Sequence, residues 1–355
     1  MSYVLGFEEI TKASLPVVGG KNASLGEMLR VGIRVPPGFA VTTHSYFKFI
    51  TEAGVVQEIS KILATVNPDD VPSLDGASTR IRKLMDKAPM PPAIANAVGE
   101  AYALLCKKCE VKELPVAVRS SATAEDLPGA SFAGQQDTFL WVRGNEEVLE
   151  KIKSCMSSLF TARAISYRIK KGFPHEKVLI SVGVQKIVDA KAAGVMFTLN
   201  PVNGDPSKVV IEGSWGLGET VVSGQVNPDK FVVDKVVFEI NERIVSPKTI
   251  ECKYEAGKGV IHCDVPLAQQ NISCLEDKEI IELVKVAKQI EDHYGSPQDI
   301  EWAIEKHKTF PFNIFILQSR PETVWSQKKK EPVLGKKTAY ELLMEKALLQ
   351  IKVGT

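Results

Sequence analysis

Two apolar segments, at residues 298–305 and 312–319, carry the side chains whose chemistry is easiest to infer. In the first segment, the strand period of two places Asp299 and Glu301 on one face and the large apolar residues on the other. If the two segments pair as a hairpin, Glu301 and Gln318 can lie side by side. A carboxylate and an amide oxygen are hard ligands that suit Mg²⁺, which keeps its other positions for waters and phosphate oxygens. The spacing therefore predicts a magnesium site on this hairpin.

The second segment also supplies a cation. The same alternation puts Gln318 and Arg320 on a face with Ile314 and Ile316. Arg320 can then reach phosphates that the same metal ion holds. The alternative is a polar strand facing solvent, but the apolar character of the segment argues against full exposure, so we favour the functional interpretation.

Arg119 stands at the end of an apolar strand, where an arginine is costly unless it is paired. The loop after it, at residues 120–135, offers hydroxyl groups and glycines, and such a loop can present backbone N–H groups to phosphates. Phe132 in this loop is typical of a mobile lid. The alternative is a solvated turn rich in Ser and Thr.

A third candidate anion site is Lys21, which follows Gly19 and Gly20 at the start of an expected helix. Glycine lets the backbone approach an anion, a helix N-terminus favours negative charge, and lysine adds a positive charge. The pattern is not a Walker A motif, so a glycine turn with a surface lysine stays open as the alternative.

Two further segments are less specific. The apolar strand at 182–188 resembles segments that offer a carbonyl and an N–H to adenine, and by itself it proves nothing. Gly216 and Gly218 miss the G-x-G-x-x-G spacing and no βαβ unit surrounds them, so we interpret them as part of a structural loop that can line the cleft.

The elements that position these residues follow from apolar periodicity and from turn signals. A Gly-Gly turn and a helix are expected at 13–30, and residues 43–113 are expected to be mainly helical, with breaks at 67–68 and 89–92. The class is α+β, with much antiparallel sheet late in the chain. The other expected elements are short strands at 35–41 and 115–121, a helix at 146–171, strands at 178–188, 193–199, 208–212 and 229–236, and a helix at 276–294.

The six cysteines predict no metal centre. Cys106 and Cys109 form a C-x-x-C pair, which can serve redox or zinc chemistry, but the second pair of a structural zinc site is missing. The spacing of 11 residues among Cys252, Cys263 and Cys274 fits no ligand template. We expect reduced thiols on a helix and in the core.

The composition of the 355 residues is ordinary for a globular protein, with 44% hydrophobic and 25% charged residues. The net charge of +1 gives no basic field for nucleic acid or a membrane surface. Neither a membrane span nor a secretory signal is visible, so we expect a cytoplasmic protein.

A change of character near residue 325 suggests two domains, 1–324 and 325–355. The second begins as a charged linker and continues as an amphipathic helix at about 339–351. This helix can dock on a partner or pack on its own chain, and the sequence leaves both open.

Long motifs in this chain resemble the nucleotide-binding domain of the phosphoenolpyruvate synthase and pyruvate phosphate dikinase family. The resemblance covers residues 1 to about 323 and implies an ATP-grasp fold, in which two α+β subdomains clamp ATP. The motifs are GGKNASLGEM (19–28), VPPGFAVTT (35–43), VRSSATAEDLPGASFAGQQDTFL (118–140), GVQKIV (183–188), GVMFTLNP (194–201) and DIEWAI with ILQSRPET (299–323).

The resemblance also implies roles for individual residues. It implies that ATP and Mg²⁺ are the cofactors, with the metal on Glu301 and Gln318. The phosphates would contact Lys21, Arg119 and Arg320, which would act in catalysis. Adenine would lie along Gln185, Lys186 and Ile187, and the phosphate lid would be formed by Gly129, Ser131, Phe132, Ala133 and Gly134.

Full-length members of the family continue into a domain with a phosphoryl-carrying histidine, and none of the five histidines here lies in a comparable motif. We therefore expect an ATP-binding subunit that needs a phosphohistidine-domain partner. Stand-alone chains of this size resemble the ATP-binding subunit of phenylphosphate synthase. That resemblance implies cleavage of ATP to AMP and phosphate, with the β-phosphoryl passing through the partner's histidine to phenol. The alternatives are a subunit of a split phosphoenolpyruvate synthase, with pyruvate as acceptor, and a noncatalytic ATP-sensing subunit.

Overall fold

The computed structural model describes residues 2–123, 126–127, 130–131 and 137–325. Contacts divide the chain into a compact unit, Met1–Pro321, and a remainder, Glu322–Thr355. Every helix and strand of the described residues belongs to the first unit. The expected linker and C-terminal helix lie outside the described residues, so the interpretation of residues 325–355 as a docking domain stays a prediction.

Helices occupy most of the first half of the unit, with breaks at the expected proline sites. No helix among the described residues is long and apolar enough to cross a membrane. The α-helices are α1 (Leu15–Arg30), α2 (Thr43–Glu52), α3 (Val56–Ala64), α4 (Val71–Lys87), α5 (Pro92–Lys108), α6 (Asn145–Ser157), α7 (Ala162–Lys171), α8 (Glu219–Val222), α9 (Leu267–Gln270) and α10 (Asp277–Tyr294).

The single helix expected at 146–171 is wrong, because α6 and α7 are separate helices. Thr161 has extended backbone angles, φ −60° and ψ 151°, and its side chain accepts a hydrogen bond from the N–H of Ala164 at 3.3 Å. Threonine is a good N-cap because its oxygen satisfies one of the unpaired donors of the first turn. The cap therefore starts a new helix inside the apolar pattern.

The strands form two large antiparallel sheets. The first has the order β1-β2-β7-β3-β6, and the second has the order β11-β10-β9-β8-β14-β15. Two small hairpins, β4-β5 and β12-β13, complete the described strands. The strands are β1 (Val4–Gly6), β2 (Gly38–Val41), β3 (Val116–Ala122), β4 (Asp126–Leu127), β5 (Ala130–Ser131), β6 (Thr138–Val142), β7 (Ile180–Lys186), β8 (Ala190–Phe197), β9 (Lys208–Trp215), β10 (Asp229–Asp234), β11 (Ile240–Ile244), β12 (Ile250–Glu255), β13 (Gly259–Asp264), β14 (Gln298–Glu305) and β15 (Ile314–Pro321).

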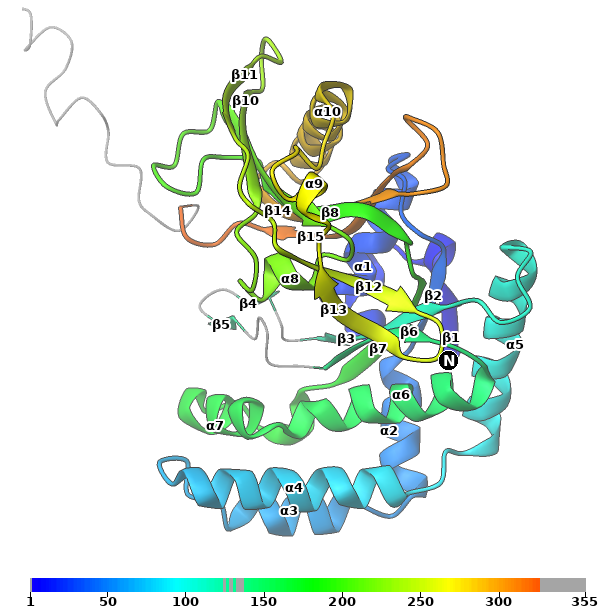
Figure 1. Cartoon of the computed structure of the whole chain (residues 1–355). Coiled ribbons are helices and arrows are strands. Elements are labelled where there is room, and N and C mark those ends of the chain that lie inside the picture. Colours follow the sequence, from blue (N-terminus) through cyan, green and yellow to red (C-terminus); the bar gives the residue numbers. More distant parts are fainter. Residues whose placement is uncertain (1, 124–125, 128–129, 132–136, 326–355) are drawn as a thin grey trace, which may run out of the picture. The chain divides into compact units, whose positions relative to one another are not determined.

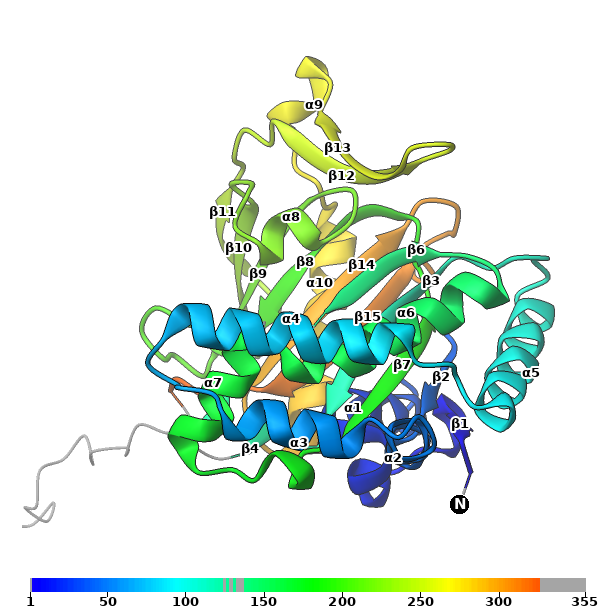
Figure 2. The same ribbon diagram turned by 90° about the horizontal axis from the view of Figure 1, so that it is seen from below.

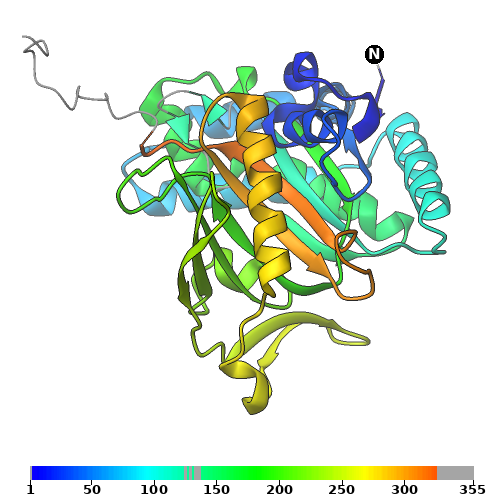
Figure 3. The ribbon, with the colours of Figure 1, turned by 90° about the horizontal axis from the view of Figure 1, so that it is seen from above.

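Each large sheet has its own helical cover. Helices α2, α5 and α6 contact the first sheet, α4 packs on α6, and α3 and α7 pack on α4 (Figures 1 and 2). The apolar side chains of these helices form one core with the sheet. Helix α10 lies across the second sheet, where the fully buried Trp302 anchors another core (Figure 3). Helix α1 contacts β3 and β7 of the first sheet and β15 of the second. The two sheets therefore meet at α1.

Candidate active site

The hairpin of β14 and β15 brings the expected metal ligands together. Glu301 pairs directly with Gln318, as the spacing predicts. The expectation that Gln318 and Arg320 share a face with Ile316 is wrong, because the register shifts by one residue at Glu301 and Trp302.

A β-bulge at Leu317 explains the change of face. Ile316 pairs with Trp302 and belongs to the core under α10. Leu317 and Gln318, although consecutive, both line one small cavity. Bulges are frequent next to active sites, where they redirect a side chain. This one turns the polar end of β15 away from the core.

A cavity of about 200 Å³ lies against this hairpin. One of its walls is polar and comes from β14 and β15, and the other is apolar and comes from β8 and α8. Asp299, Glu301, Gln318 and Arg320 form the polar wall, and Val195, Phe197, Val221 and Val222 form the apolar wall.

Asp299 holds Arg320 in this wall. The Nε and Nη2 atoms of Arg320 donate hydrogen bonds of 2.9 and 2.7 Å to Asp299 Oδ2. Asp299 has a 15% exposed side chain, whereas the arginine side chain is 43% exposed, so the carboxylate is the fixed partner. The sequence alone predicts no role for Asp299. The hairpin register could have indicated its role: if Glu301 pairs with Gln318 in an antiparallel hairpin, Asp299 must lie opposite Arg320.

Arg119 on β3 links the first sheet to this hairpin. Its Nη1 atom lies 3.5 Å from Glu301 Oε2 and 3.5 Å from the carbonyl oxygen of Leu317. Its Nε atom is buried and has no hydrogen-bond partner within the part of the chain that the structure describes. Since both contacts are long, the guanidinium keeps donor capacity for an anion.

Lys21 reaches the same region from α1. Its Nζ atom donates to the carbonyl oxygen of Ser120 at 3.2 Å. The helix is interrupted at Gly19, where φ is +72°, and a Cβ atom there would lie 2.1 Å from the carbonyl oxygen of Ser121. The expected glycine turn is therefore confirmed, and it brings the backbone of α1 directly against β3.

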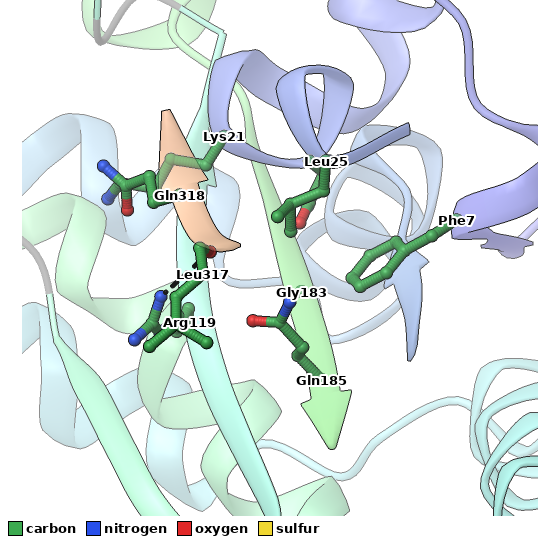
Figure 4. Close-up of a pocket in the computed structure, with 9 residues that line it drawn as sticks. Phe7, Lys21, Leu25, Arg119, Gly183, Gln185, Leu317 and Gln318 are labelled. Atoms are coloured by element: carbon green, nitrogen blue, oxygen red, sulfur yellow. Dashed lines mark hydrogen bonds between the residues drawn. The ribbon is translucent and has the colours of Figure 1, made fainter. Parts of the chain in front are cut away.

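A cavity of about 10 Å³ joins these parts. Figure 4 shows Lys21, Arg119, Gln185 and Gln318 around it, with the hydrogen bond from Arg119 to Leu317 drawn. Gln318 lines this cavity and also the larger one. The structure thus brings residues from α1, β3, β7 and β15 to one place.

The segment expected to lie along adenine ends β7. Gln185 is 3% exposed and lines the smaller cavity. The backbone N–H groups of Lys186 and Ile187 donate to proline carbonyls at 2.8 and 3.1 Å, so they are used inside the protein. The Nζ atom of Lys186 forms an ion pair of 3.0 Å with Glu305, the last residue of β14. This pair is a second link between the sheets.

Most of the expected lid lies outside the described residues. The residues concerned are Gly129, Phe132, Ala133 and Gly134. Ser131 belongs to β5, whose backbone pairs with β4. The lid assignment therefore stays a prediction.

The described residues fit an anion with a hard cation. Glu301 and Gln318 offer adjacent oxygen ligands of the kind that Mg²⁺ prefers. Lys21, Arg119 and Arg320 surround this pair with positive charge, and the buried Nε of Arg119 is a donor without a partner within the described chain. A phosphate group would satisfy that donor.

Comparison with known proteins identifies a family for this chain. Residues 15–340 match the family model described as pyruvate phosphate dikinase, AMP/ATP-binding domain. A protein named probable phosphoenolpyruvate synthase from Archaeoglobus fulgidus is 48% identical over 92% of this chain. Proteins with the same name from Methanocaldococcus jannaschii and Staphylothermus marinus are 46% and 44% identical over 99% and 94% of this chain.

The chain spans less than half the length of these relatives, at 42%, 29% and 43% respectively. The match covers nearly all of the residues that the structure describes, and it confirms the α+β class and the ATP-grasp-type architecture expected from the sequence. The chain therefore belongs to the pyruvate phosphate dikinase AMP/ATP-binding domain family.

Proposed function

We propose that the chain binds Mg·ATP against the β14–β15 hairpin and acts as the ATP-cleaving part of a dikinase-type phosphotransferase. The observation that carries this proposal is the convergence of Arg119, Glu301, Gln318 and Arg320 from two sheets on adjoining cavities. The cavity of about 200 Å³ is smaller than the roughly 300–1,000 Å³ of whole-ligand pockets, so it suits the polyphosphate end of the nucleotide.

The proposed roles follow from residue chemistry. Lys21, Arg119 and Arg320 bind phosphate oxygens and stabilise the charge that develops during phosphoryl transfer. Glu301 and Gln318 hold Mg²⁺, which when bound neutralises phosphate charge. Asp299 orients Arg320 through the paired hydrogen bonds.

Two further parts of the site complete the proposal. Adenine lies along Gln185, Lys186 and Ile187, and since the last two N–H groups are already bonded, these residues contact it through carbonyl groups and side chains. The glycine-rich loop at 129–134 covers the phosphates.

The proposed reaction consumes ATP and water: the β-phosphoryl group passes to a histidine nitrogen, the γ-phosphoryl group passes to water and leaves as phosphate, and AMP is released. None of the described residues that line the two cavities is a histidine. The accepting imidazole therefore comes from sequence outside these walls, on a partner or on a further domain, and the site itself needs no general base.

The identity of the final acceptor separates two versions of this proposal. The relatives are named phosphoenolpyruvate synthase, and this supports pyruvate over the phenol implied by the resemblance to phenylphosphate synthase. A noncatalytic ATP-sensing role has less support, because each of the proposed phosphate and metal residues is present.

The test supplies a histidine domain from a full-length relative to the purified chain, with Mg·ATP and either pyruvate or phenol. We expect AMP and a phosphorylated histidine domain whenever the domain is present, phosphoenolpyruvate only when pyruvate is added as well, and no AMP with the Arg320→Ala chain. Formation of phenylphosphate would favour the other acceptor. ADP as the product would contradict the dikinase chemistry.

A further inference from the structure

A second group of metal-binding residue types lies outside the polar wall of the large cavity. Glu219 at the start of α8, Cys252 on β12 and His262 on β13 place their ligand atoms within 4.8 Å of one another. We propose that these three residues bind one Zn²⁺ ion, which fastens α8 to the β12–β13 hairpin.

The backbone sets this arrangement before any ion binds. Cys252 and His262 are directly opposite in the antiparallel hairpin, so their side chains share one face. The N–H of Leu217 donates to the carbonyl oxygen of Cys252 at 2.7 Å, two residues before Glu219. Gly216 bridges to the same strand, and a Cβ atom there would lie 2.3 Å from that carbonyl oxygen. The three ligands are therefore held together by main-chain contacts.

The observed spacing agrees with a tetrahedral ion. Cys252 Sγ lies 3.7 Å from Glu219 Oε2. Bond lengths of about 2.3 Å for Zn–S and about 2.0 Å for Zn–O at a tetrahedral angle place the two ligand atoms about 3.5 Å apart. Little movement of either side chain is needed.

The donor set selects the class of metal. A thiolate and an imidazole are typical ligands of Zn²⁺, whereas Mg²⁺ prefers oxygen ligands alone. Three protein ligands leave the fourth tetrahedral position for water. Glu219 and His262 are exposed, which gives an ion a path to the buried Cys252.

An ion here would fix a wall of the candidate active site. Val221 and Val222 of α8 line the cavity of about 200 Å³. Cys252 packs with Leu217 and Phe315 in an apolar cluster that adjoins the same sheets. Zinc would therefore hold α8 in place beside the cavity without entering it.

The competing arrangement has a proton in place of the metal. In the absence of an ion, the Cys252 thiol lies at hydrogen-bonding distance from Glu219 Oε2. A hydrogen bond alone would give the same contact, so the two arrangements differ in whether the sulfur is bonded to metal.

The test is a Co²⁺ titration of the full chain, stripped by chelator under reducing conditions. We expect one Co²⁺ per chain with a near-ultraviolet thiolate-to-cobalt band, and Zn²⁺ should displace it. Cys252→Ser should abolish the band, and His262→Ala should weaken Zn²⁺ binding by more than the roughly 10–100-fold that loss of an outer-shell partner costs. Cys263→Ser, next in sequence to His262 but on the opposite face of β13, is the matched control and should bind as the wild type does.

Hydrogen exchange tests whether Zn²⁺ fastens α8 to the β12–β13 hairpin. Zn²⁺ should slow amide exchange in α8 and β12 of the wild-type chain and leave the His262→Ala chain unchanged. Absence of a thiolate band in the wild-type chain, or equal Zn²⁺ affinity in the wild-type and His262→Ala chains, would overturn the proposal. His262 is exposed, so this variant decides the question even if Cys252→Ser does not fold.

Discussion

At the scale of single residues, the direction of Arg320 is set by Asp299. A guanidinium on an exposed strand samples many rotamers, but two hydrogen bonds to one carboxylate oxygen restrict this one to the cavity wall. The restriction lowers the entropic cost of binding an anion, because the cation is already in position.

Arg320→Ala is expected to weaken Mg·ATP binding by about 10- to 150-fold, because a hydrogen bond to a charged group contributes about 1.5–3 kcal/mol. Asp299→Asn should weaken it less, since the cation remains and only its orientation is lost. Calorimetry of Mg·ATP binding measures both. Arg80→Ala, which removes a side chain that is 64% exposed, is the control and should bind normally. Equal affinity in Arg320→Ala and Arg80→Ala would exclude the proposed contact.

His175 is expected to make the stability of the folded chain depend on pH. The Nε of Arg168, which is 1% exposed, donates to its Nδ1 atom at 2.7 Å. Burial, and then the charge of Arg168, lower the pKa of His175 to about 4. Below about pH 6.5, the unfolded chain therefore binds a proton at His175, whereas the folded chain leaves this imidazole neutral until the pH approaches 4. The contribution to stability is present above pH 6.5 and is lost as the pH falls towards 4.

Urea unfolding at pH 7 and pH 5 should show this loss in the wild-type chain. In His175→Gln the loss should be smaller by about 1 kcal/mol, a value reduced for the partial exposure of the ring. His307→Gln, at a side chain that is 81% exposed, should behave as the wild type does. The account of His175 fails if all three chains lose the same stability.

At the scale of elements, the break in α1 positions Lys21. Gly19 adopts φ +72°, a conformation that other residues reach only with strain, and it touches the backbone of Ser121. The N–H of Asn22 then donates to the hydroxyl of Ser121 at 3.3 Å. The glycine thus joins α1 to β3.

Gly19→Ala is expected to destabilise the chain by more than about 2 kcal/mol, because the new methyl group meets a carbonyl oxygen and the backbone is strained. Gly76→Ala in α4, where nothing lies within 4 Å of the new methyl group, should instead stabilise it by about 0.5–1 kcal/mol. Chemical denaturation measures both. A neutral effect of Gly19→Ala would contradict the close approach.

The elements also show where a sequence stops being informative. The period of two correctly places Asp299 and Glu301 on one face of β14 and Trp302 on the other face, because alternation along a strand is a local property. The face of Gln318 and Arg320 depends on the bulge at Leu317, which arises from pairing with another strand. No local pattern contains that register, so the hairpin was predicted but the orientation of its polar end was not.

At the scale of the whole unit, charged pairs join the two sheets. Arg119 of β3 lies 3.5 Å from Glu301 of β14, and Lys186 of β7 lies 3.0 Å from Glu305 of the same strand. A ligand held by both sheets should add to these links and stabilise the folded unit by mass action.

Mg·ATP at about 100 times its dissociation constant is expected to stabilise the chain by about 2.7 kcal/mol, which corresponds to a rise of about 4 °C in Tm. Removal of Mg²⁺ by a chelator should lose most of this rise. In Glu301→Gln, the rise with Mg²⁺ should fall to the level seen without it. Differential scanning fluorimetry measures these values, and an equal rise in the variant would show that Glu301 does not bind the metal.

The long-range arrangement explains what else the sequence could not show. The motif residues around Lys21, Arg119 and Arg320 lie far apart in the chain, and only the resemblance to a known family joined them in advance. The Glu219, Cys252 and His262 cluster lies outside the motifs that carry the family resemblance, and the spacing of the cysteines alone argues against a metal. Its ligands come together through hairpin register and the Gly216 bridge, which are properties of the folded chain.

The most direct test of the account is a crystal structure of the chain with Mg²⁺ and a non-hydrolysable ATP analogue. We expect phosphate oxygens on Lys21, Arg119 and Arg320, and the metal between Glu301 and Gln318. A nucleotide bound elsewhere, or bound with Arg119 and Arg320 not contacting its phosphates, would contradict it.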